Sequence, residues 1–140
     1  MTRWLGVDYG KKRIGLAISD PGESIASPAS TLNAAGAAPE DAKLVLDWAA
    51  RNEIDAIVVG LPLNMDGSEG SQAKLTSGFA RRMREEGELP IELWDERLTS
   101  FQADEYMQQA GLSAARQKKL RDALAAQVML QSFLDARRTP

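Results

Sequence analysis

Hydrophobic and polar positions in the first part of the chain follow the pattern of extended strands. Residues 3–9 and 13–19 are apolar segments that flank Gly10-Lys11-Lys12, which predicts two antiparallel strands joined by a tight turn. A weaker strand is predicted over residues 24–32. Its Pro28 suits the edge of a sheet, because proline has no N–H to donate to a neighbouring strand.

The remaining chain alternates helical and extended patterns. Pro39-Glu40-Asp41 favours the start of a helix, which is predicted to run to Asn52, because proline fits the first turn and acids suit the positive end of the dipole. The later elements are a strand at 55–60, a helix at 71–86, a strand at 90–94, and helices at 99–111 and 115–136. This order predicts an α/β fold with a mixed five-stranded sheet flanked by helices, in a single domain of residues 1–140.

Composition limits the available chemistry. The chain has no cysteine and no histidine, which excludes thiol nucleophiles, disulfides, histidine-centred triads and the usual zinc ligands. No segment reaches the roughly 18 apolar residues of a membrane span, and the start lacks a signal peptide, so we expect a soluble, cytoplasmic protein without a membrane partner. The net charge of −3 argues weakly against nucleic acid, although lysine and arginine are clustered. Each basic cluster taken alone is typical of a solvated face.

Asp8 is the most informative residue. Side chains alternate along a strand, so Trp4, Gly6 and Asp8 share one face, and Gly6 is expected to leave that face open beside the carboxylate. Desolvation makes an ionised group costly in a buried strand unless a cation, a partner or a catalytic role keeps it charged. The pattern therefore predicts a metal ion at Asp8.

The pattern also predicts which other acids lie near Asp8 and which do not. Asp95 and Glu96 end the fifth strand, which should run parallel to the first, so they are expected near Asp8. Asp122 heads an apolar helical stripe, although an ion pair with Lys118 or Lys119 would equally explain it. Asp20 should lie roughly 20 Å from the partner of Asp8, at about 3.4 Å per residue, and is not expected to share the metal.

Several motifs in order along the chain resemble the YqgF family of the ribonuclease H-like superfamily, described as pre-16S rRNA nucleases and as Holliday-junction resolvases. The matching segments are Gly6-Val7-Asp8-Tyr9-Gly10 with Arg13-Ile14-Gly15, Gly60-Leu61-Pro62 with Asp66-Gly67-Ser68, Asp95-Glu96-Arg97-Leu98-Thr99-Ser100, and Asp122 with Ala125-Ala126 and Leu130-Gln131. The resemblance implies a ribonuclease H-like fold and a catalytic, metal-binding triad of Asp8, Glu96 and Asp122. Arg121 departs from the family, which often has an apolar residue there.

Three carboxylates brought together repel one another, and Mg²⁺ or Mn²⁺ would relieve that repulsion through oxygen ligands. One hypothesis is that Gly60, lacking a side chain, leaves room for the metal; the alternative is that it merely begins a turn. Arg97 would either orient Glu96 or contact a phosphate, unless it forms only a surface ion pair. The nucleic-acid-binding residues are predicted to be Lys11, Lys12, Arg13, Asn64, Ser68, Arg97, Lys118 and Lys119.

The predicted function is metal-dependent hydrolysis of phosphodiester bonds, in processing the 5′ end of precursor 16S rRNA during ribosome biogenesis. Structured RNA, and with it ribosomal particles, would be the partner of a monomer or homodimer. The alternatives are a resolvase of branched DNA, which favours a dimer, and a non-catalytic nucleic-acid-binding module. Asp8-Tyr9-Gly10 also resembles the phosphate-binding hairpin of actin-like phosphotransferases. Those enzymes need two domains, and this chain supplies one.

Overall fold

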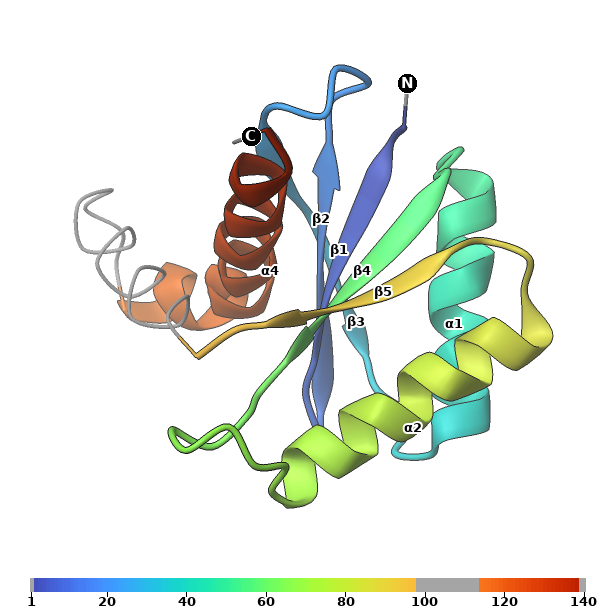
Figure 1. The fold of residues 1–140 in the computed structure, drawn as a ribbon, viewed down its shortest axis with the longest axis vertical. Helices are drawn as coiled ribbons and strands as arrows, with labels where there is room; N and C mark the ends of the chain where they lie inside the picture. The colour runs from blue at the N-terminus through green and yellow to red at the C-terminus, as the bar shows by residue number, and fades with distance from the viewer. Residues whose placement is uncertain (1, 98–113, 139–140) are drawn as a thin grey trace.

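The strands form one mixed sheet, and the described helices cover its two faces (Figure 1). The computed structural model describes residues 2–97 and 114–138, without the side chains of 114–120 and 138. The predicted elements within these ranges are confirmed, and the helix predicted over 99–111 lies outside them. The strands are β1 (Trp4–Tyr9), β2 (Arg13–Ser19), β3 (Ala26–Asn33), β4 (Ala56–Leu61) and β5 (Ile91–Asp95), and the helices are α1 (Ala38–Arg51), α2 (Ser71–Glu86) and α4 (Ala114–Arg138).

The strand order, β3-β2-β1-β4-β5, brings three strand ends together. β1 pairs with β2 in antiparallel register and with β4 in parallel register, and β5 is parallel to β4. The carboxyl ends of β1, β4 and β5 therefore lie at one edge of the sheet. The register places Gly15 of β2 opposite Asp8, and Trp94 of β5 opposite Gly60 of β4.

Alternation along the strands produces one apolar core on each face of the sheet. Leu5 and Val7 of β1 are buried on the side of α1 and α2, whereas Trp4 packs on the side of α4 (Figure 1). Trp4 and Trp94 both meet Phe133 of α4 edge to face, at ring-centroid distances of 4.7 and 5.6 Å. Trp4 is buried in this core, and Trp94 is partly buried against it.

Tyr9 fastens the end of β1 to the helices on the face opposite α4. Its ring stacks on Phe79 of α2 at 4.0 Å, and its hydroxyl donates a 2.6 Å hydrogen bond to buried Asp41 of α1. Asp41 also accepts a hydrogen bond of 2.7 Å from the main chain of Ala35. Burial and the hydrogen bond to Asp41 raise the pKa of Tyr9. Tyr9 is therefore partly buried against the helices and holds the end of β1, next to Asp8, in place.

Helix α4 lies along the opposite face with the predicted apolar stripe. Ala126, Met129 and Phe133 are buried against the sheet, and Asp122 stands one turn nearer the amino end of the helix. Within the part of the chain that the structure describes, no helix has the length and apolar composition needed to cross a membrane.

Candidate active site

Asp8 lies at the carboxyl end of the central strand β1, on the face covered by α4. Its carboxyl is largely enclosed by protein, and this burial, together with the negative charge of Asp122, raises its pKa to about 6. Both causes disfavour the charged form. The fold thus places Asp8 where an ionised carboxylate without a counter-charge is unfavourable, as the sequence predicted.

Glu96 follows β5 and reaches back across β4 toward Asp8. Its main-chain N–H donates to the carbonyl of Leu61 at 3.2 Å, which keeps the chain beside β4 after the strand has ended. Burial, then the charges of Asp8 and Asp95, raise its pKa to about 7. The charge of Asp8 acts on Glu96, so both carboxyls lie at the same end of the sheet within electrostatic reach of each other.

Two glycines lie beside the acidic residues. A Cβ on Gly60 would collide with the Glu96 carboxylate, so the missing side chain makes room for Glu96. Gly60 lies within β4, so it does not merely begin a turn. Gly6 does not leave an open face, because Leu130 of α4 would lie 2.8 Å from its Cβ. The expectation for Gly6 was wrong, because the absence of a side chain does not show which neighbour fills the space.

Asp122 is brought to Asp8 by a close approach of α4 to β2. The main-chain carbonyl of Asp122 lies where a Cβ on Gly15 would be, so only glycine permits this spacing. Sequence reasoning missed this role of Gly15. A signal existed, since a hairpin turning at Gly10-Lys11-Lys12 places Gly15 directly opposite Asp8.

The partner of Asp122 is Arg13, which the sequence analysis predicted to bind the nucleic-acid backbone. Arg13, the first residue of β2, donates from Nε to Oδ2 of Asp122 at 2.6 Å. The alternative partners, Lys118 and Lys119, have side chains outside the described part of the structure. The ion pair links the hairpin to α4 at the edge of the acidic centre.

The donor chemistry fits a hard divalent cation. The functional groups are carboxylates, without sulfur or imidazole, and the raised pKa values of Asp8 and Glu96 reflect burial and repulsion that a cation would offset. Among the described residues, no three acidic side chains stand close enough to hold one ion as they are placed. The Asp122 carboxylate is instead engaged by Arg13.

The loop after β4 is ordered by its own polar side chains. Asn64 donates to the Ser68 hydroxyl at 3.0 Å, and Asp66 accepts from the main chain of Ser68 at 2.9 Å. Arg97 contacts this loop at the carbonyl of Met65, but its main partner is Asp95, at 2.6 Å. Arg97 also lowers the pKa of Asp95. Of the alternatives for Arg97, the structure therefore shows a surface ion pair with Asp95.

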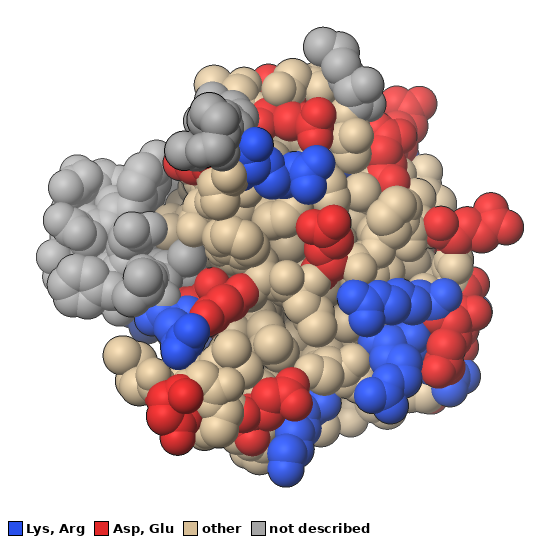
Figure 2. Space-filling model, in the orientation of Figure 1, with Lys and Arg blue, Asp and Glu red and all other residues tan. Residues whose placement is uncertain are grey.

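Lysine and arginine side chains on one face of the molecule are separated by acidic ones (Figure 2). Lys11 and Lys12 are exposed on the turn next to Asp8, as predicted, whereas Arg82 pairs with Glu86 along the exposed side of α2. On the face shown in Figure 2, acidic and basic side chains are interspersed without a continuous basic surface. Attraction of a polyanion to this face would therefore be weak without added positive charge at the acids.

Asp20 is kept apart from the site, as predicted. It follows the last residue of β2 and accepts hydrogen bonds from the main chain of Ser24 and Ile25, at 2.9 and 2.8 Å. These bonds lower its pKa. Asp20 therefore stabilises the turn at the opposite end of the hairpin from Asp8.

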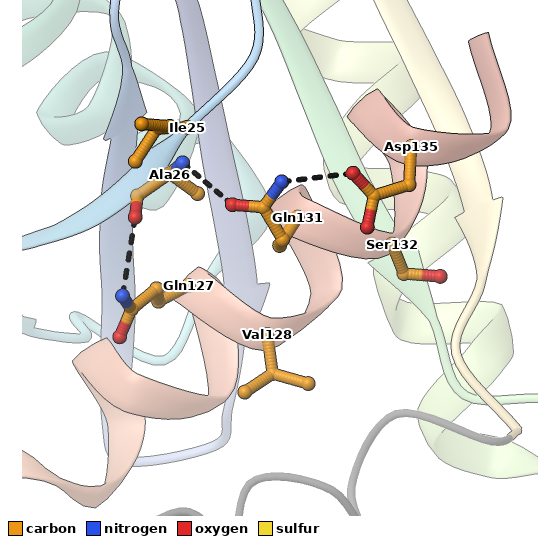
Figure 3. A pocket seen from close by; sticks show the side chains of 7 residues that line it. All are labelled: Ile25, Ala26, Gln127, Val128, Gln131, Ser132 and Asp135. Carbon is orange, nitrogen blue, oxygen red and sulfur yellow. Dashed lines mark hydrogen bonds between the residues drawn. The ribbon is translucent and has the colours of Figure 1, made fainter. Parts of the chain in front are cut away.

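A pocket of about 500 Å³ lies between the start of β3 and α4, and its lining does not include Asp8, Glu96 or Asp122 (Figure 3). Gln131 accepts from the main-chain N–H of Ala26 at 2.8 Å, and Gln127 donates to the carbonyl of the same residue at 3.1 Å. The two side-chain amides thus form hydrogen bonds with main-chain groups on the outer side of the edge strand β3. They attach β3 to α4 and are not part of the candidate active site.

The raised pKa values predict an unusual dependence of stability on pH. The folded protein holds more protons on Asp8 and Glu96 than the unfolded chain does between about pH 4 and pH 7. The free energy of unfolding should therefore fall as the pH rises through this range. We expect a loss of about 4 kcal/mol between pH 5 and pH 8 in EDTA, measured by urea unfolding.

The double variant Asp8→Asn/Glu96→Gln is the control for this measurement. The pKa values of Asp20, Asp66 and Asp95 are lowered, so these acids titrate below the range and cannot mimic the effect. Stability of the double variant should therefore change little between pH 5 and pH 8. An equal loss in both proteins would show that other groups are responsible.

The order of the strands and the helices on the two faces of the sheet define a ribonuclease H-like fold. Two solved structures share it over nearly the whole chain. Fowlpox virus resolvase, in complex with Holliday junction DNA, has a TM-score of 0.63 at 12% identity, with 98% of this chain and 99% of that chain covered. RuvC of T. thermophilus, with a Holliday junction substrate, has a TM-score of 0.58 at 20% identity, with 99% and 97% covered.

The chain belongs to the RuvX family, described as Holliday junction resolvase, whose model matches residues 2–136. A relative from Anaeromyxobacter dehalogenans, provisionally named pre-16S rRNA nuclease, is 46% identical over 135 residues, covering 96% of this chain and 98% of the relative. A relative from Caldanaerobacter subterraneus with the same provisional name is 39% identical over 137 residues, covering 97% and 98%. The resemblance to YqgF proteins is thereby confirmed.

Proposed function

We propose that this nuclease hydrolyses phosphodiester bonds with the help of Mg²⁺ or Mn²⁺, and that its substrate is the 5′ end of precursor 16S rRNA during ribosome biogenesis. The observation that carries the proposal is the meeting of Asp8 and Glu96, from two different strands, in an environment that raises both pKa values. Groups held in a costly charged state at one site are typical of catalytic centres. The provisional name of the relatives supports the choice of RNA.

Asp8 and Glu96 would hold the cation, and Asp122 would join them after leaving Arg13. When bound, the ion supplies Lewis-acid polarisation of the phosphate and lowers the pKa of the attacking water. The chain's own contribution is to fix the carboxylates on a rigid sheet edge, with Gly60 and Gly15 providing the necessary space. The Asp8 position is further secured by the packing of neighbouring Tyr9.

The nucleic-acid backbone would be bound by groups at the same end of the sheet. Lys11, Lys12 and Arg13 extend from the β1–β2 turn, and the loop with Asn64 and Ser68 leaves the end of β4. Arg97 borders that loop. Lys118 and Lys119 belong to the first turns of α4, on the amino side of Asp122. Contacts of this kind position phosphates without reading sequence.

Resolution of branched DNA is the second candidate, favoured by the description of the family. A symmetric four-way junction presents two equivalent cleavage positions, which suits a homodimer, whereas trimming of RNA requires only one subunit. The actin-like alternative has lost its support, because the family model spans residues 2–136. A non-catalytic module is the remaining alternative that cleavage assays address directly.

Cleavage of two substrates by the purified protein tests the proposal. One substrate is an RNA stem with a 5′ extension, and the other is a four-way DNA junction, each with Mg²⁺, Mn²⁺ or EDTA. We expect the RNA to be cut with metal and left intact in EDTA. The variant Glu96→Gln should lose this activity. Glu92→Gln, the same chemical change at an exposed position of β5, should keep it.

Each alternative predicts another result. Cleavage of the junction alone would establish the resolvase activity in place of RNA processing. Metal-independent binding of either substrate without cleavage, unchanged by Glu96→Gln, would indicate a non-catalytic module.

A further inference from the structure

The ion pair between Arg13 and Asp122 stands at the boundary between the acidic centre and solvent. Nε of Arg13 lies 2.6 Å from Oδ2 of Asp122, and the two side chains are 45% and 23% exposed. Arg13 is thus the outer member of the pair and Asp122 the inner one. A ligand arriving from solvent can reach the guanidinium without opening the core.

The two partners differ in their freedom to move. The main chain of Asp122 is held against Gly15 by the packing of α4, so its carboxylate can change direction only by side-chain rotation. Arg13 follows the exposed Lys11-Lys12 turn and has a long side chain. Exposed ion pairs contribute about 1 kcal/mol or less, so this pair can be exchanged for another interaction at low cost.

A cation at Asp8 and the guanidinium of Arg13 compete for one carboxylate. The charge of Asp122 already acts on Asp8, so the carboxylate lies at the edge of the proposed metal site. While Arg13 is bound to Asp122, the Asp122 carboxylate is not available to a divalent cation, and the positive charge of Arg13 repels that cation. A phosphate group is a suitable replacement partner for Arg13, because guanidinium binds phosphate through paired, charge-assisted hydrogen bonds.

We infer that Arg13 is a positioning residue that couples binding of the nucleic-acid backbone to completion of the metal site. In the free protein it holds Asp122 away from the cation. When a backbone phosphate binds Arg13, the Asp122 carboxylate is released to turn toward Asp8 and Glu96. The inference rests on the proposed function and adds to it that the complete metal site forms on the substrate.

Metal binding in the absence of nucleic acid tests the first half of this coupling. We would titrate Mn²⁺ into the EDTA-stripped protein at pH 8 and follow the free ion by electron paramagnetic resonance. Arg13→Gln should bind Mn²⁺ roughly threefold to tenfold more tightly than the wild type, because Asp122 is released. Lys12→Gln removes the same charge from the same turn without touching Asp122, and should change the affinity less.

The side-chain resonance of Arg13 tests the second half without any cleavage. In ¹⁵N-labelled protein, the Nε–H signal of Arg13 should be identified by its loss in Arg13→Gln and its shift in Asp122→Asn. Addition of the RNA stem in EDTA should move this signal away from its position in the free protein. The four-way DNA junction serves as the second probe of the same response.

The possible failures are distinguishable. Equal Mn²⁺ affinity of wild type and Arg13→Gln, together with weaker binding by Asp8→Asn, would overturn the coupling and leave the proposed nuclease site standing. The same holds if Lys12→Gln tightens binding as much as Arg13→Gln, or if bound RNA leaves the Arg13 signal unmoved. Absence of Asp8-dependent Mn²⁺ binding in every variant would reject both.

Discussion

Asp8→Asn should lower the rate of metal-dependent RNA cleavage by about a thousandfold, which corresponds to about 4 kcal/mol of transition-state stabilisation. Asp8 lies on the central strand between the other two acids: the charge of Asp122 acts on Asp8, and the charge of Asp8 acts on Glu96. Asparagine keeps the shape and one oxygen but removes the negative charge that a divalent cation requires. The measurement is a single-turnover cleavage assay with saturating Mn²⁺.

A stability measurement separates this loss from misfolding. Because burial and the charge of Asp122 disfavour the ionised Asp8 carboxyl, Asp8→Asn should raise the free energy of unfolding at pH 8 in EDTA, by about 1 kcal/mol or more. Asp47→Asn, the same chemical change at an exposed position of α1, should alter neither activity nor stability appreciably. Equal cleavage by wild type and Asp8→Asn would falsify the assignment of Asp8.

The second large effect is expected at Gly15. A Cβ there would overlap the main-chain carbonyl of Asp122, which cannot move without shifting α4 from the sheet. We expect Gly15→Ala to lower the free energy of unfolding by about 2 to 3 kcal/mol, as in other overpacked cores. Cleavage should also fall at least tenfold, since Asp122 moves with the helix. Urea unfolding and the cleavage assay measure the two effects.

Gly78→Ala provides the matched control. Gly78 lies inside α2, and a Cβ there would meet no atom within 4 Å. Alanine should therefore stabilise the helix by about 0.5 to 1 kcal/mol and leave cleavage unchanged. If Gly15→Ala behaved like Gly78→Ala, the close approach of α4 would not be what places Asp122.

Local patterns were sufficient for the elements and for much of the topology. The apolar alternation of residues 3–9 and 13–19 and the turn between them were predicted correctly, because strand periodicity and turn chemistry are properties of neighbouring residues. The crossover helices then required β1, β4 and β5 to be parallel, which placed Glu96 at the same end as Asp8.

Contacts between distant segments were predicted less well. Gly6 was expected to leave an open face, yet Leu130 fills that space, and the contact of Glu96 with the position of Gly60 was not predicted. Nothing in the residues beside a glycine states which part of the chain will pack there. The same limit applies to Tyr9, whose hydroxyl bonds to Asp41 from a helix more than thirty positions later.

The sequence by itself determined the kind of chemistry available and the strand ends at which it is placed: carboxylates without histidine or cysteine, at residues whose order matches the RuvX family. Only the tertiary structure decided how α4 meets the sheet. Its approach over Gly15, and the engagement of Asp122 by Arg13, join residues more than one hundred positions apart. Such contacts depend on the packing of whole elements, because a side chain's partner is chosen by the surfaces that folding brings together and not by its neighbours along the chain.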